Sequence, residues 1–256
     1  VVEEAATQMQ FCITRSNSFH GRMDLVSEGL KYFQKKKAGT PYVIHGNSGS
    51  GKTSLMAKLA VEAKVKVAEK PGVNPVVITR FCGTSPHSSS APDLVKSILQ
   101  HIALAYDKMA SSSSDSFKAA YTSLHESLKF ATFKKPLLIF IDSLDQLNDA
   151  ARGRSELDWI PDRLPPNVYL VVSTLPNIGG CLHALQKKKS IPGSNYLYVT
   201  NLSMSDATSI IDGWLDEAKR TLSKAQKDKL LYLAVDDSQE APTVLRLRLL
   251  FDKAKK

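Results

Sequence analysis

Along residues 1–202, short apolar runs rich in β-branched residues alternate with longer stretches that carry apolar residues at helical spacing. Runs that are apolar on both faces and separated by helices are typical of a buried parallel sheet. We therefore predict an α/β fold with a central five-stranded, mainly parallel sheet flanked by helices. The predicted strands cover residues 41–46, 73–83, 135–142, 167–174 and 195–202, and the predicted helices cover residues 52–69, 91–107, 114–131 and 180–187.

The pattern changes after residue 202, where three stretches with helical spacing follow one another with no strand between them. Ser205 and Ser223 stand at positions typical of helix N-caps, and Pro242 is typical of a first helical turn. We therefore predict a small all-α helical domain over residues 203–256, following an α/β domain over residues 1–202. The serine run at residues 111–114 is expected to connect two helices.

The composition is that of a folded protein, with 43% hydrophobic residues. No apolar run approaches the roughly 20 residues that a membrane-spanning helix needs. The first residues have neither the basic segment nor the apolar core of a secretory signal, and without an initiating Met we expect the chain to be cut from a longer protein. Cys12, Cys82 and Cys181 are too widely spaced for a metal site or a disulfide framework, so we expect a cytoplasmic protein.

The net charge is +9, and the basic residues gather in short clusters near residues 35–37, 134–135, 187–189 and 253–256. An excess of positive charge favours nucleic acid or anionic membranes. These clusters are scattered and contain no interleaved aromatic residues, which is typical of solvated loops and helix ends. We therefore expect no nucleic-acid partner, and keep a nucleic-acid-linked ATPase as an alternative.

Residues 46–53 read GNSGSGKT and match the spacing G-x-x-x-x-G-K-[ST] in full. Such a loop uses glycines to turn backbone N–H groups onto phosphates, a lysine to reach the β- and γ-phosphates, and a hydroxyl to ligate Mg²⁺. An apolar run precedes the motif and a helical stretch follows it, so the positive end of that helix adds to the anion site. The predicted nucleotide-binding residues here are Gly46, Asn47, Ser48, Gly49, Ser50, Gly51, Lys52, Thr53 and Ser54.

A second motif, LLIFIDSLDQL, ends a buried apolar run in two acids. Asp142 is placed to hold Mg²⁺ opposite Thr53, and these two residues form the predicted metal site. Asp145 follows three residues later, where it could orient or deprotonate an attacking water. Lys52, Asp142 and Asp145 are therefore the predicted catalytic residues.

The segment DSLDQL resembles the second acidic motif of NACHT-type NTPases, which belong to the signal-transduction ATPases with numerous domains. FHGR at residues 19–22 resembles the motif that precedes the P-loop in this class. Residues 80–103, 157–176 and 238–254 are similar to the segments after the second strand, through the fourth strand and in the C-terminal helix. The whole is most similar to the NACHT domains of NACHT and WD-repeat proteins, with nephrocystin-like and telomerase-associated proteins as looser relatives.

The resemblance implies further site residues. Phe19, Gly21 and Arg22 would line the adenine and ribose side, and Pro242 would close over the base. The family places an arginine near the end of the fourth strand, whereas this chain reads Ser-Thr-Leu-Pro at residues 173–176. Thr174 would offer a hydroxyl to the phosphate there. Two further residues bear on hydrolysis: Gln146 stands where a glutamate is frequent, and Arg80 is a candidate to replace the arginine.

The resemblance also implies a function: an ATP/ADP-dependent molecular switch with slow Mg²⁺-dependent hydrolysis. It would control self-association of a larger signalling protein, whose other partners bind segments outside this chain. The acidic strand is followed by no guanine-reading N-K-x-D motif, which favours adenine. The first alternative is a scaffold that holds ADP permanently and hydrolyses ATP poorly.

Overall fold

The computed structural model describes residues 2–35, 38–85, 88–109, 116–188, 191–235 and 241–254. Its centre is one five-stranded sheet in which all the neighbouring strands are parallel, in the order β2-β3-β4-β1-β5. The predicted α/β fold is confirmed, and the sheet is parallel throughout rather than mainly parallel. The strands are β1 (Tyr42–Gly46), β2 (Val76–Phe81), β3 (Leu137–Asp142), β4 (Val168–Thr174) and β5 (Tyr196–Val199).

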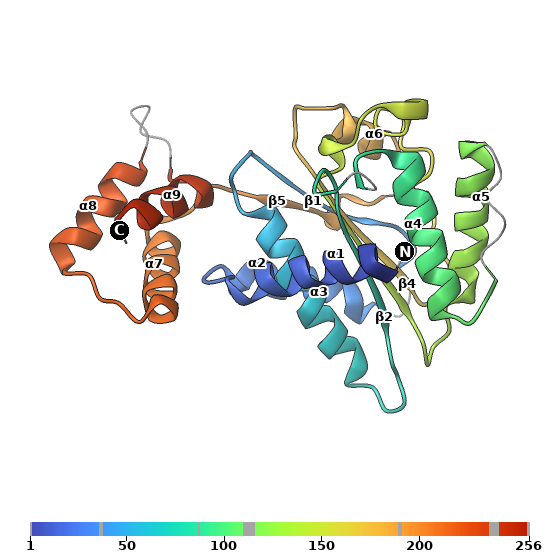
Figure 1. The fold of residues 1–256 in the computed structure, drawn as a ribbon, viewed down its shortest axis with the longest axis horizontal. Helices are drawn as coiled ribbons and strands as arrows, with labels where there is room; N and C mark the ends of the chain where they lie inside the picture. The colour runs from blue at the N-terminus through green and yellow to red at the C-terminus, as the bar shows by residue number, and fades with distance from the viewer. Residues whose placement is uncertain are drawn as a thin grey trace.

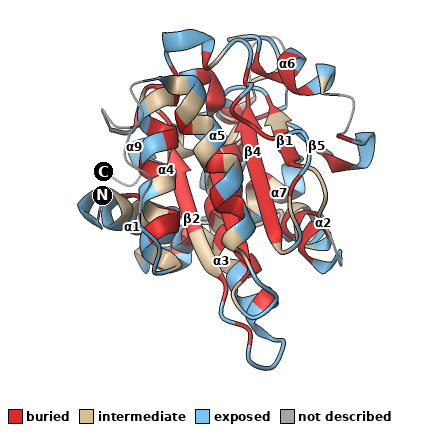
Figure 2. Cartoon of the chain, turned by 90° about the vertical axis from the view of Figure 1, so that its right-hand side faces the viewer, coloured by how far each residue is buried: buried red, intermediate tan, exposed pale blue. Residues whose placement is uncertain are grey.

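Helices cover both faces of this sheet, and this explains why the strands are apolar on both sides (Figures 1 and 2). Successive residues of β3 face opposite ways: Ile139 packs with one buried cluster and Phe140 with the other. One face is covered by α1 (Val2–Asn17), α2 (Met23–Gln34) and α3 (Lys52–Ala68), and the other by α4 (Ala91–Ala105), α5 (Phe117–Ser127) and α6 (Cys181–Lys187).

The two N-terminal helices are absent from the sequence-based assignment. The buried side of α1 is mostly polar, because it consists of Gln8, Cys12 and Ser16 at successive four-residue steps and only Cys12 joins the hydrophobic core. Gln8 Oε1 accepts a hydrogen bond of 2.8 Å from the Phe81 backbone N–H, and the Cys12 thiol lies 3.6 Å from the Ala57 carbonyl oxygen. A helix that docks through such contacts leaves no apolar stripe to detect.

Three further helices lie at one end of the molecule, beside the β5 edge of the sheet (Figure 1). They are α7 (Met204–Ala218), α8 (Lys224–Ala234) and α9 (Val244–Ala254), and their apolar faces form a third buried cluster around Trp214, Leu247 and Phe251. The division of the chain at residue 202 stays a prediction.

Two of the predicted helix starts are wrong. Ser203 rather than Ser205 caps α7, because its hydroxyl accepts the Asp206 N–H while the Asp206 carboxylate accepts the Ser203 N–H. Pro242 lies before α9 rather than in its first turn, and the Thr243 hydroxyl accepts the Arg246 N–H at 3.2 Å. Ser223 caps α8 as predicted.

Short 3-10 helices complete the described structure, at Leu128–Phe130, Leu144–Gln146, Ala150–Arg152 and Gly193–Asn195. The serine run at residues 111–114 lies outside the described residues, as do parts of three lysine clusters, at residues 36–37, 189 and 255–256. In the part of the chain that the structure describes, no helix is both long and apolar enough to span a bilayer.

Candidate nucleotide-binding site

Residues 46–53 form the loop between β1 and α3, called the P-loop below. Its shape depends on glycine. Gly49 and Gly51 have positive φ angles of 74° and 96°, which L-residues with a side chain rarely adopt. A Cβ on Gly46 would overlap the carbonyl oxygen of Val199 on the neighbouring β5. The loop therefore has the backbone freedom that a phosphate cradle requires, at the N-terminus of a 17-residue helix.

The Lys52 side chain folds back across this loop. Its ammonium donates hydrogen bonds to the carbonyl oxygens of Gly46, at 2.8 Å, and Asn47, at 2.9 Å. Burial lowers the pKa of Lys52, while the charges of Asp142 and Asp145 raise it. The cation is thus bound to the loop, and the charges of both predicted acids favour its protonated form.

Asp142, at the end of β3, lies directly against the P-loop. Its carboxylate accepts the Thr53 hydroxyl at 2.7 Å, and also the hydroxyls of Ser143, at 3.1 Å, and Ser173, at 2.5 Å. The two predicted Mg²⁺ ligands are therefore in contact. Among the described residues, no group of three or more His, Cys, Asp or Glu side chains could hold a metal. One carboxylate and one hydroxyl fit Mg²⁺, which usually binds through few protein ligands together with phosphate oxygens.

Burial raises the pKa of Asp142, although the three hydroxyls oppose this shift. Because the folded chain binds this proton more tightly than the unfolded chain, the contribution of Asp142 to stability falls as the pH rises from the unfolded pKa to the folded pKa. The ionised form is then destabilising at neutral pH, where Mg²⁺ would need it.

Replacing Asp142 with Asn removes that buried charge but keeps one oxygen that can accept the Thr53 and Ser143 hydroxyls, while the new NH₂ group can donate to the Ser173 hydroxyl oxygen. We expect Asp142→Asn to have an equal or higher Tm at neutral pH, and Mg²⁺ to no longer strengthen its binding of ATP. Thermal unfolding and ATP titration with and without Mg²⁺ measure both effects. The exposed Asp158→Asn is the control, and a lower Tm in Asp142→Asn alone would contradict the role of burial.

Asp145 is buried beside the end of β4, with 7% of its surface exposed. One carboxylate oxygen accepts the Leu175 backbone N–H at 2.9 Å, and the other accepts the Gln146 side-chain amide at 2.9 Å. The structure thus fixes the orientation of this acid through backbone and side-chain donors that the sequence motif does not reveal.

The turn at residues 19–22 lies against the P-loop. The Arg22 guanidinium donates to the carbonyl oxygens of Ser50, at 3.3 Å, and Thr200, at 3.0 Å, and to the Thr200 hydroxyl at 3.2 Å. Gly21 packs on α7, and Phe19 packs at the edge of the cluster that contains α3. Arg22 and the P-loop, 28 residues apart in the chain, are therefore brought together.

The start of α9 also contacts the P-loop. Pro242 is buried and its carbonyl accepts the Leu202 N–H at 2.9 Å, while the next residues reach the glycines. The Leu245 N–H donates to the Gly49 carbonyl at 3.1 Å, and a Cβ on Gly51 would lie 3.0 Å from the Val244 side chain. These contacts were missed from sequence, because Val244 and Leu245 carry no motif beyond their position after Pro242.

A family model described as NACHT domain matches residues 40–218, more than half of the chain. The chain belongs to the NACHT family. It is 32% identical to human NACHT domain- and WD repeat-containing protein 1, over 93% of this chain and 15% of that protein. Telomerase protein component 1 of rat is 28% identical, over 70% of this chain and 7% of its own length. Nephrocystin-3 of Xenopus tropicalis is 27% identical, over 74% of this chain and 13% of its own length. The chain thus spans a small part of each relative, and the predicted resemblance is confirmed.

Solved structures support the fold of this NACHT domain. The Aeropyrum pernix ORC1 protein, solved in complex with DNA, has a TM-score of 0.62 at 16% identity, over 93% of this chain and 60% of that chain. The ORC2 protein of the same organism, solved as ADPNP-ADP complexes, has a TM-score of 0.54 at 12% identity, over 91% of this chain and 60% of that chain. The NACHT domain therefore has the fold of P-loop NTPases.

At the end of β4, where the resemblance led us to expect an arginine, this NACHT domain has Thr174 and Leu175. Thr174 is buried and its hydroxyl donates to the Leu175 carbonyl at 3.3 Å. Arg80, the candidate replacement for the family arginine, is bound to α4: its guanidinium donates to the Ser97 hydroxyl and carbonyl, each at 3.1 Å. The hydrogen bonds of Arg80 thus hold it away from the phosphate loop.

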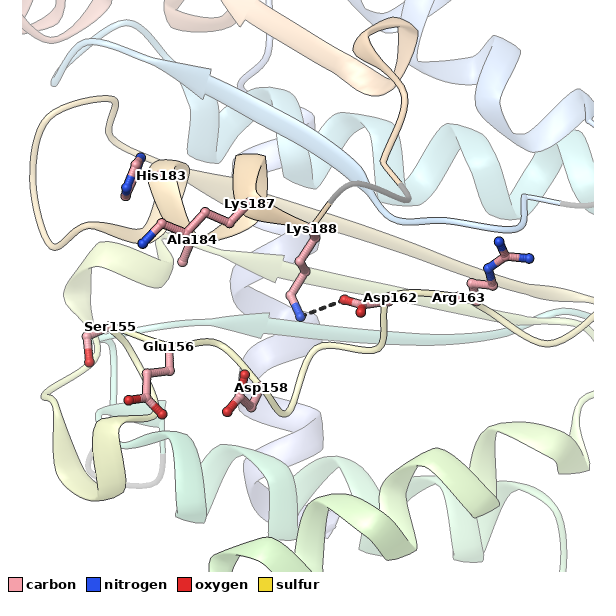
Figure 3. A pocket seen from close by; sticks show the side chains of 9 residues that line it. All are labelled: Ser155, Glu156, Asp158, Asp162, Arg163, His183, Ala184, Lys187 and Lys188. Carbon is pink, nitrogen blue, oxygen red and sulfur yellow. Dashed lines mark hydrogen bonds and ion pairs between the residues drawn. The ribbon is translucent and has the colours of Figure 1, made fainter.

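A cavity of about 610 Å³ lies elsewhere in the NACHT domain, between α6 and the loop that follows the acidic motif (Figure 3). His183 and Lys187 line it from α6 and Lys188 from the residue after that helix, opposite acidic residues of the loop. Lys188 forms a 2.8 Å ion pair with Asp162. It contains none of the predicted nucleotide-binding residues, which instead lie along the P-loop and its neighbours.

Proposed function

We propose that this NACHT domain is a switch that binds ATP or ADP with Mg²⁺ at the P-loop and hydrolyses ATP slowly. The supporting observation is that two segments distant from the P-loop in the chain both bind to it. Arg22 donates to the Ser50 carbonyl from one side, and the Leu245 N–H donates to the Gly49 carbonyl from α9. A nucleotide that reshapes this loop would therefore act on the N-terminal turn and on the C-terminal helices together.

Lys52, Thr53 and Asp142 would hold the phosphates and the metal. The metal would neutralise charge on the phosphates, while Lys52 would exchange its loop carbonyl partners for phosphate oxygens. Arg22, Gly21 and Phe19 would lie toward the ribose and base, and Pro242 would approach the base from the helical side. We also propose residues 203–256 as the lobe that moves relative to residues 1–202.

Slow hydrolysis follows from the surroundings of Asp145. Both of its carboxylate oxygens already accept hydrogen bonds, so an attacking water would have to compete with the Leu175 N–H and the Gln146 amide for them. Leu175 supplies only a backbone N–H where an arginine would stabilise charge on the γ-phosphate. Thr174 would add a weak hydroxyl contact at most.

Self-association of a larger protein is part of the proposal and rests on the family alone. The relatives named above are several times longer than this chain, and segments outside it would supply further partners. We expect no nucleic-acid binding, since basic residues such as Lys35 and Lys188 are engaged within the chain by Asn195 and Asp162.

An ADP-locked scaffold is the second candidate, favoured by the engaged carboxylate of Asp145. Nucleotide exchange separates the two. The domain is loaded with fluorescent ADP and chased with excess ATP and Mg²⁺, while a single-turnover assay follows phosphate release. The switch requires that ADP leaves and that ATP is then cleaved slowly. ADP that never exchanges would establish the scaffold instead.

A further inference from the structure

One face of α7 receives the turn at residues 19–22, which lies at the end of α1 and α2 nearest to α7 (Figure 1). The contacting residues of α7 are Asp206, Ile210, Gly213 and Glu217, and steps of three and four residues place them in one line along a helix. A Cβ on Gly21 would lie 3.2 Å from Ile210 and 3.6 Å from the Asp206 carbonyl oxygen. The turn thus packs closely along the helix surface.

Gly213 makes room for His20 within this line. A Cβ on Gly213 would overlap the imidazole ring and would lie 2.9 Å from the His20 Cβ. Rotation of the ring cannot move the His20 Cβ, because that atom is fixed by the backbone of the turn. The absence of a side chain at residue 213 is therefore what lets the turn approach α7.

Glu217 lies one helical turn further on. Its carboxylate oxygen is 2.9 Å from His20 Nε2, and the two side chains are 41% and 24% exposed. The contact is an ion pair when the imidazole is protonated, and at this exposure it adds specificity more than stability.

Arg22 belongs to the same turn and has a positive φ of 51°. This left-handed conformation is unfavourable for arginine, so the surroundings must maintain it. Its guanidinium reaches Ser50 and Thr200 on the α/β side, while the charge of Asp206 acts on it from α7. The backbone of the turn is held on α7, and its arginine is held on the P-loop.

We propose that His20 is a positioning residue of the nucleotide site: docked on Gly213 and Glu217 of α7, it fixes the turn that places Arg22 against the P-loop. This rests on the nucleotide binding proposed above and deepens it. The affinity for the nucleotide then depends on the position of α7, which acts through His20 and Arg22 and not through a contact of its own with the phosphates.

The main test is Gly213→Ala, with Gly193→Ala as the matched control. Alanine favours a helix more than glycine does, so a loss of function in Gly213→Ala cannot come from a weaker α7. A Cβ on Gly193 meets no atom within 4 Å. We expect Gly213→Ala to weaken ADP binding about tenfold, because displacing a positioned charged group by a fraction of an ångström is costly. Gly193→Ala should bind like the unaltered chain, and unchanged affinity in Gly213→Ala would overturn the proposal.

Two combined variants separate positioning from a general structural effect. In an Arg22→Ala background, Gly213→Ala should cause no further loss of ADP affinity, because His20 acts through Arg22. Adding His20→Gly to Gly213→Ala removes both the ring and the His20 Cβ, and should return the affinity to that of His20→Gly alone. An equal tenfold loss in the Arg22→Ala background would contradict the role of His20.

Hydrogen exchange keeps this inference distinct from the proposed function. The amides of Phe19 and Leu25 donate to the Ser16 and Arg22 carbonyl oxygens at the two ends of the turn, and they should exchange faster in Gly213→Ala than in Gly193→Ala, without any nucleotide present. If the unaltered chain binds no ADP, the proposed function is wrong, and the docking role of His20 is then tested by hydrogen exchange alone. Equal exchange in the two variants would then overturn the docking role of His20, and faster exchange in Gly213→Ala would support it.

Discussion

Replacing Lys52 with alanine is expected to weaken the binding of both ADP and ATP by at least about 100-fold, equivalent to roughly 3 kcal/mol. Lys52 contributes the ammonium closest to the loop carbonyls, where it bonds to Gly46 and Asn47. A charge-assisted contact to phosphate is among the strongest hydrogen bonds that a side chain makes. Isothermal titration of the nucleotide-free chain measures the loss.

The control for Lys52→Ala is Lys58→Ala, six residues along the same helix. Lys58 forms a 2.9 Å ion pair with Glu62, four residues on, so its loss removes one positive charge without touching the loop. Thermal unfolding of both variants checks that α3 remains folded. Normal affinity in Lys52→Ala would mean that residues 46–53 do not bind phosphate.

Replacing Asp145 with asparagine is expected to slow ATP hydrolysis by about 100-fold or more while leaving ADP affinity within about threefold. Asparagine at position 145 keeps an oxygen that can accept the Leu175 N–H. The Gln146 side-chain amide can rotate so that its oxygen accepts from the NH₂ group of the new asparagine. The local structure is therefore preserved, and what is lost is the negative charge that would act on water. Single-turnover phosphate release, together with ADP titration, separates the two effects.

Asp107→Asn serves as its control, because Asp107 is exposed and its positive φ of 53° suits asparagine. It changes the net charge by the same amount, away from the P-loop. Unchanged turnover in Asp145→Asn would show that another residue positions the attacking water.

The sheet could be predicted because its strands are buried on both faces. Residues 137–141 are apolar without interruption, and alternate side chains enter the two buried clusters. Helix α1 was missed because it docks through Gln8 and Cys12, whereas α2 was missed although Val26, Tyr32 and Phe33 form a buried apolar face. The α7 cap was misplaced by two residues, because Ser203 and Ser205 both precede helical spacing and only the Asp206 bonds distinguish them.

At the site, side-chain chemistry was visible in the sequence and backbone contacts were not. The motifs led us to place Asp142 opposite Thr53, and the Thr53 hydroxyl donates to Asp142 at 2.7 Å, while the metal-binding role of the two residues stays a prediction. The Ser173 hydroxyl that binds Asp142 comes from β4, 31 residues further along the chain. The Leu175 N–H that binds Asp145 comes from the residue after β4, 30 residues further along. The Leu245 N–H that donates to the Gly49 carbonyl comes from a residue still further along the chain. A backbone donor of this kind cannot be recognised from the identity of its residue.

The central claim is that this chain holds an adenine nucleotide with Mg²⁺ at the P-loop. Its most direct test is titration of the purified chain, stripped of any copurifying nucleotide, with ADP and with ATP in the presence of Mg²⁺. We predict saturable binding of one nucleotide per chain, lost in Lys52→Ala and retained in Lys58→Ala. Absence of binding for both nucleotides at millimolar concentration, in a chain that unfolds cooperatively, would contradict it.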